Sequence, residues 1–93
     1  MTDEAKHPRE VPGYEGRLDE LVENLGKLDY RTLKTILDGL GDDLLAQARA
    51  DERRGREQLA SALYESSRSA HRTVEVLDRV CRICEPYMPK NSK

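Results

Sequence analysis

The stretch from Glu57 to Glu85, EQLASALYESSRSAHRTVEVLDRVCRICE, has the most regular pattern in the chain. With Leu63 at position a of a seven-residue repeat, small and apolar residues fall at positions a, d, e and g, and polar residues fill almost all the others. A strip this wide is typical of a helix that contacts two neighbours, as in a bundle. Because Pro86 interrupts the pattern, we expect a helix over about residues 56–85.

Two earlier segments also have helical spacing. The first, over about residues 17–28, places apolar residues three or four positions apart. They are Leu18, Leu21, Val22, Leu25 and Leu28. The second, over residues 30–53, follows Asp29, which can cap its start. Gly39 and Gly41 weaken this second helix, so a kink or a break near Gly41 is an alternative.

Gly55 predicts the turn between the second and third helices. It follows Arg53 and Arg54, and basic residues followed by glycine are a common helix stop. One continuous helix over about residues 42–85 is the main alternative. A turn at Gly55 would place leucines opposite small residues and so allow close antiparallel packing. The leucines are Leu37, Leu40 and Leu44, and the small residues are Ser66, Ser67, Ser69 and Ala70.

These patterns predict an all-α fold with a single helical domain over residues 17–85. The architecture is either a three-helix bundle or a helical hairpin with a short extra N-terminal helix, which dimerisation could complete. Residues 1–16, which contain two prolines and two glycines among charged residues, are expected to form a flexible tail, and residues 86–93 a second one.

Composition excludes several classes of protein. The chain has 93 residues, 37% of them hydrophobic, with no Trp or Phe and a net charge of -2, so it is too short for a barrel or a doubly wound sheet. No apolar run approaches the roughly 20 residues that cross a bilayer, and the N-terminus does not resemble a signal peptide. We therefore expect a cytoplasmic protein without a membrane partner.

Cys81 and Cys84 form the only short motif that suggests chemistry. A redox pair places its reactive thiolate at a helix N-terminus, whereas this pair lies at a predicted C-terminus, where the helix dipole opposes a thiolate. Two cysteines supply half of a tetrahedral zinc site, so only a dimer would complete one. Because both lie at apolar repeat positions, we favour core packing, with a metal or redox role as an alternative.

No catalytic, metal-binding or cofactor-binding residue is predicted. His7 lies in the expected tail and His71 on the polar side of its helix, and neither has a Ser, Cys or carboxylate at a suitable spacing for catalysis. No phosphate-binding glycine loop and no small-molecule substrate site is recognisable.

Four arginines at the end of the second helix form a candidate nucleic-acid patch: Arg49, Arg53, Arg54 and Arg56. Charges of both signs surround them, which is typical of a solvated helical surface. A DNA-associated regulator is therefore the second functional hypothesis.

The leading hypothesis is a non-enzymatic protein-protein interaction module that forms a homodimer and acts as an adaptor or regulatory subunit. The C-terminal part of the third helix has more apolar circumference than one neighbour covers, and such a surface usually marks an interface. The predicted interface residues are Val74, Val76, Leu77, Val80, Ile83 and Cys84.

Overall fold

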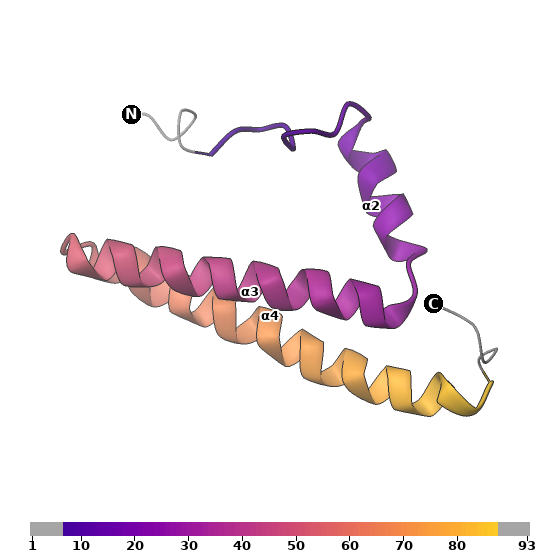
Figure 1. The fold of residues 1–93 in the computed structure, drawn as a ribbon. Coiled ribbons are helices and arrows are strands. Elements are labelled where there is room, and N and C mark those ends of the chain that lie inside the picture. Colours follow the sequence, from indigo (N-terminus) through magenta and orange to yellow (C-terminus); the bar gives the residue numbers. More distant parts are fainter. Residues whose placement is uncertain (1–6, 88–93) are drawn as a thin grey trace.

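A computed structural model describes residues 7–87 of the chain, and within this range it is all-helical (Figure 1). Its elements are α2 (Leu18–Gly26), α3 (Tyr30–Arg53), α4 (Glu57–Cys84) and the 3₁₀ helix η1 (Glu85–Tyr87). The all-α prediction is confirmed, and the predicted helix bounds differ from the observed ones by at most two residues. The expected tails lie partly outside the described residues, at 1–6 and 88–93.

The long helices α3 and α4 run antiparallel and form a hairpin (Figure 1). Among the helices of residues 7–87, extensive packing is confined to this pair, and α2 extends from the start of α3. The arrangement is therefore the hairpin with a short extra helix, not the closed three-helix bundle that was the other predicted form. Among residues 7–87, no helix combines the length and the apolar content needed to cross a bilayer.

Asp29 caps the start of α3, as its sequence position predicts. Its carboxylate accepts hydrogen bonds from the Thr32 backbone N–H at 2.8 Å and from the Thr32 hydroxyl at 3.0 Å. These bonds lower the pKa of the Asp29 carboxyl, the backbone N–H having the larger effect. The cap sets the point at which the chain leaves α2 and enters the hairpin.

Gly55 reverses the chain direction between α3 and α4. It has a φ of 82°, in the left-handed region that glycine adopts without strain. The Arg56 N–H donates to the Asp51 carbonyl oxygen at 2.9 Å, and the Gly55 N–H to that of Glu52 at 3.0 Å, which is the Schellman pattern. The predicted turn is confirmed, and the alternative of one continuous helix over residues 42–85 is wrong.

A buried carboxylate stabilises this turn. The Asp51 side chain is only 12% exposed, and its Oδ1 accepts a 3.2 Å hydrogen bond from Arg56 and lies 3.7 Å from Arg54. The interaction joins the last turn of α3 to the first residue before α4.

Gly41 does not interrupt α3, so the alternative break near this residue is wrong. The glycine is buried, and a Cβ atom there would lie 2.7 Å from the His71 ring. The Ser67 hydroxyl donates a 2.7 Å hydrogen bond to the Gly41 carbonyl oxygen from the facing helix. Because Gly41 lacks a side chain, α4 can approach α3 closely at this point.

The hairpin is packed through small residues. Ala48 is fully buried, Ala60 and Ser67 are 2% and 3% exposed, and no large side chain within residues 7–87 is completely buried. The expected packing of leucines against small residues is partly wrong, since Leu40 is 53% exposed and both Ser66 and Ser69 face solvent. Small residues on both helices bring the backbones together and leave the larger apolar groups at the sides of the hairpin.

Candidate interaction surface

Apart from the buried contact of Ser67 with Gly41, the polar contacts between the described residues of the two hairpin helices lie along one side, which we call the polar edge. From α4, Tyr64, His71 and Asp78 are seven residues apart and therefore share one face. Tyr64 Oη donates to Glu52 Oε1 at 2.6 Å, and Lys34 Nζ donates to Asp78 Oδ1 at 2.8 Å.

The polar edge shifts the pKa of two of its groups. The Lys34 ammonium, followed by the Arg82 guanidinium, lowers the pKa of the Asp78 carboxyl because both favour the charged form. The hydrogen bond to the Glu52 carboxylate raises the pKa of Tyr64 because it favours the protonated phenol. These contacts hold α4 in register against α3.

His71 lies against α3, which corrects its assignment to a solvated face without a carboxylate partner. Its Nε2 is 3.0 Å from Asp42 Oδ1 and 3.6 Å from Asp38 Oδ1, and its side chain is 32% exposed. Sequence spacing does not reveal this cluster, because the aspartates lie 29 and 33 residues before the histidine. The hairpin alone brings the three together.

Asp38, Asp42 and His71 are also the residues within the described range that could hold a metal ion, with ligand atoms within 4.8 Å of one another. Both aspartates are exposed, and Asp42 already lies at hydrogen-bond distance from the imidazole. We therefore interpret the three as a polar clamp between α3 and α4.

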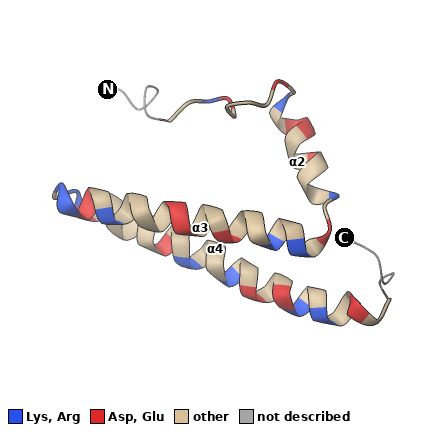
Figure 2. Cartoon of the chain, viewed as in Figure 1, with Lys and Arg blue, Asp and Glu red and all other residues tan. Residues whose placement is uncertain are grey.

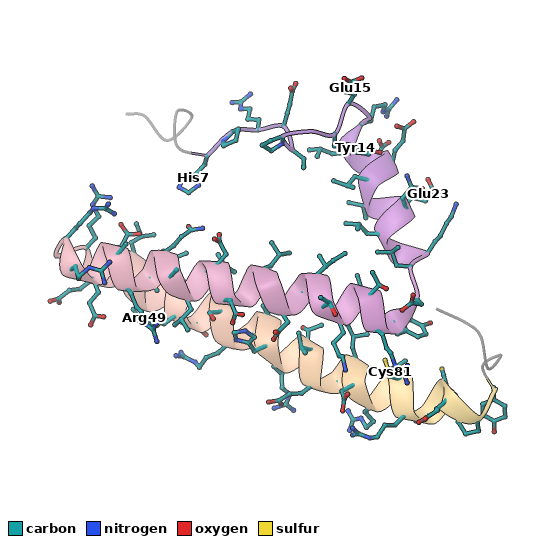
Figure 3. All side chains as sticks on the ribbon, viewed as in Figure 1. His7, Tyr14, Glu15, Glu23, Arg49 and Cys81 are labelled. Atoms are coloured by element: carbon teal, nitrogen blue, oxygen red, sulfur yellow. The ribbon has the colours of Figure 1, made fainter. Side chains whose placement is uncertain are left out.

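The cysteine pair is placed as apolar packing predicts. Cys81 is 8% exposed and lies on the side of α4 that faces α3, and Cys84 is half-buried (Figure 3). Both thiols are free. Neither belongs to a group of three potential metal ligands within residues 7–87.

The structure divides the predicted apolar strip of α4 into two faces. Every residue at positions a and e from Ala60 to Cys84 is buried or half-buried, and this face packs on α3. Positions d and g form a second face, which we call the α4 stripe. Its members are Leu59, Ala62, Ser66, Ser69, Thr73, Val76, Val80 and Ile83. The strip predicted to contact two neighbours therefore contacts one.

The α4 stripe is uncharged and open to solvent. Seven of its eight members are exposed, and Val80 is half-buried. The exposed fractions of the large side chains are 62% for Ile83, 48% for Leu59 and 37% for Val76. The apolar side chains of the α4 stripe lie toward its two ends, with the hydroxyl side chains of Ser66, Ser69 and Thr73 between them, and solvent-facing apolar groups are typical of an interaction surface.

Two hydroxyl groups in the α4 stripe are hydrogen-bonded within their own helix. Ser66 Oγ donates to the Ala62 carbonyl oxygen at 2.9 Å, and Thr73 Oγ1 donates to the Ser69 carbonyl oxygen at 3.1 Å. A hydroxyl whose proton is already donated can be covered by another helix at a lower desolvation cost.

Three of the six predicted interface residues, Val76, Val80 and Ile83, belong to the α4 stripe. Val74, Leu77 and Cys84 are half-buried on the hairpin face, and Val74 also lines a shallow depression at the polar edge. The prediction missed the N-terminal part of the stripe, from Leu59 to Thr73. Separating positions d and g from a and e would have found it, because no charged residue occurs at d or g.

Of the four arginines in the candidate nucleic-acid patch, Arg53, Arg54 and Arg56 lie at the hairpin turn and Arg49 lies earlier on α3. Basic and acidic residues are close together at this end of the hairpin (Figure 2). Arg54 and Arg56 are engaged with Asp51, as described above. Arg49 and Arg53 are exposed on α3. The turn therefore has charges of both signs.

Comparison of the chain with known protein families, curated proteins and solved structures finds no match. The surfaces of the hairpin are therefore the basis for a functional proposal.

Proposed function

We propose that the protein is a non-enzymatic helical interaction module that self-associates through the α4 stripe and acts as an adaptor or regulatory subunit. The observation that carries this proposal is the row of eight uncharged residues along α4, seven of which are exposed. Full burial of a Val, Leu or Ile side chain contributes about 1.5–3 kcal/mol, and a symmetric dimer buries each stripe residue twice. Several such groups can offset the entropy lost on association.

We also propose a cytoplasmic location, which the free thiols of Cys81 and Cys84 support because cysteines stay unpaired in a reducing compartment.

Sedimentation equilibrium at micromolar concentration tests the proposal. We expect the wild-type chain to be a dimer and Val76→Glu to be a monomer, because a carboxylate cannot be buried unpaired in an apolar contact. Ser61→Glu is the matched control, since Ser61 is exposed on the same helix but lies outside the α4 stripe. A monomeric wild-type protein would contradict the proposal, as would a Val76→Glu variant that still dimerises.

A DNA-associated regulator remains the alternative, based on the arginines at the turn. Binding to duplex DNA that weakens with salt and is lost in Arg49→Glu with Arg53→Glu would support it. The mixed charges around Asp51 make this function the second choice.

A further inference from the structure

The positions of the α4 stripe are spaced symmetrically about the level of residue 71, and in its two intermediate pairs a small residue is matched with a valine. Its members pair at equal sequence distances on either side of that level. The pairs are Leu59 with Ile83, Ala62 with Val80, Ser66 with Val76, and Ser69 with Thr73. The outermost pair is large and the innermost pair is small.

This symmetry is what an antiparallel contact between two identical helices requires. In a two-fold dimer, a residue on one copy meets its pair on the other, so the surface must be complementary to its own reverse. Two crossing helices approach most closely at one point and diverge on either side of it. Small residues at the centre and large ones about 18 Å away at each end, at 1.5 Å per residue, fit that geometry.

We infer that the partner of the α4 stripe is α4 of a second copy, packed antiparallel about a two-fold axis at the level of residue 71. The inference rests on the proposed self-association and adds its orientation and register. Ser66 then packs against Val76 of the partner subunit, and Ala62 against Val80 of the partner subunit.

Charged residues beside the α4 stripe favour the antiparallel orientation. Glu65, Arg68, Glu75 and Arg79 form no ion pair within residues 7–87. Glu65 and Arg79 are at repeat position c, next to position g of the α4 stripe, and antiparallel packing places Glu65 near the height of the partner's Arg79. Arg68 and Glu75 are at position f, farther from the α4 stripe, and do not contribute to this pairing. In a parallel dimer Glu65 and Arg79 would each lie level with its own copy, where like charges repel.

Arg72 lies nearest the axis and approaches its own copy there. Its exposed position allows solvent and salt to screen this single like-charged contact. The flanking charges therefore select orientation more than they add affinity.

Thiol crosslinking tests the orientation in a chain whose cysteines are replaced by Cys81→Ala and Cys84→Ala. Ser66→Cys and Val76→Cys are prepared as separate proteins, and each is oxidised alone and as an equal mixture. Antiparallel packing predicts a disulfide-linked dimer in the mixture and little in either protein alone, because two copies of residue 66 would lie about 15 Å apart along the axis. Ser61→Cys, off the stripe, measures crosslinking by random collision.

Sedimentation of the same proteins tests self-association separately from the antiparallel orientation. A dimer in which each protein crosslinks efficiently alone would overturn the antiparallel inference and leave self-association intact. A monomeric wild-type chain would overturn both.

Exchanging the charges of residues 65 and 79 tests the antiparallel orientation in a chain that keeps both cysteines. Glu65→Arg should weaken the dimer at low salt, and Glu65→Arg combined with Arg79→Glu should restore its affinity. A double variant no tighter than the single one would contradict the antiparallel register.

Discussion

The Ser67 hydroxyl on α4 donates a 2.7 Å hydrogen bond to the Gly41 carbonyl oxygen on α3, and both residues are buried. A contact between a side chain and the backbone of a facing helix requires closely spaced helix axes, which the missing Cβ of Gly41 permits. The same closeness brings the His71 ring to Gly41 and places it beside Asp42. The missing Cβ of Gly41 thus contributes both to the close spacing of the hairpin and to the position of His71 in the polar clamp.

Gly41→Ala should therefore destabilise the protein, whereas Gly39→Ala should stabilise it. A Cβ atom at Gly41 would lie 2.7 Å from His71 Nε2 and displace the ring, and overpacking of this kind typically costs about 1–3 kcal/mol. A Cβ atom at Gly39 meets nothing within 4 Å, so Gly39→Ala should raise the free energy of unfolding by about 0.5–1 kcal/mol, because alanine has a higher helix propensity than glycine. Urea denaturation at a fixed protein concentration measures both.

Replacing the histidine gives the control for this prediction. In a His71→Ala background, Gly41→Ala should lose most of its cost because the ring is gone. An equal cost in both backgrounds would show that another contact opposes the methyl group at position 41.

The hairpin was predictable from the sequence because its signals are local. Gly55 after two arginines predicted the turn, Asp29 predicted the start of α3, and the seven-residue repeat predicted α4. The role of Gly41 was not predictable, because the low helix propensity of glycine indicates a kink or a break when only the neighbouring sequence is considered. The structural role of Gly41 depends on Ser67 and His71, which contact it from α4.

The candidate site was predictable only in part, because the repeat of α4 is a local signal whereas the rotation of α4 against α3 is not. The repeat indicated that α4 has more apolar surface than one neighbour needs, and of the predicted interface residues the structure leaves Val76 and Ile83 exposed and Val80 half-buried. Which half of the strip faces α3 depends on the rotation of α4 in the hairpin. That rotation is set by contacts distant in sequence, such as Lys34 with Asp78.

Cys81→Ser should lower stability more than Cys84→Ser. Cys81 is buried and Cys84 is half-buried, and placing a hydroxyl in an apolar site costs about 1–3 kcal/mol. Thermal unfolding followed by circular dichroism gives the comparison. If the pair instead bound a metal, the two variants would be equally damaging, and a chelator would destabilise the wild-type protein.

Asp51→Ala should destabilise the turn by about 1–2 kcal/mol. The substitution removes a nearly buried carboxylate that accepts a charge-assisted hydrogen bond from Arg56 and also lies near Arg54. The effect is limited because both arginines can return to solvent. Asp43→Ala is the control, since Asp43 is exposed and accepts its hydrogen bond from Gln47 of the same helix. Equal unfolding free energies for the two variants would contradict the role given to Asp51.

Asp78 should make the stability of the hairpin depend on pH in the acid range. Lys34 and then Arg82 lower the pKa of Asp78 below its ordinary value of 3.8 in the folded protein. A carboxyl group with a lowered folded-state pKa contributes stability that is fully present above its unfolded-state pKa. That contribution disappears as the pH falls through the folded-state pKa, because the protonated group no longer attracts Lys34.

Comparison of wild type with Asp78→Asn isolates this contribution. The wild-type protein should exceed the variant in unfolding free energy by a constant amount at pH 5–7, and the difference should shrink progressively below about pH 4. Urea titrations at fixed protein concentration across this range measure it, with concentration held constant because association also contributes to stability. Lys34→Met should also flatten the acid response, since it removes the cation with the largest effect on Asp78. A difference between wild type and Asp78→Asn that stays the same down to pH 2 would mean that the ion pair across the polar edge does not hold the two helices together.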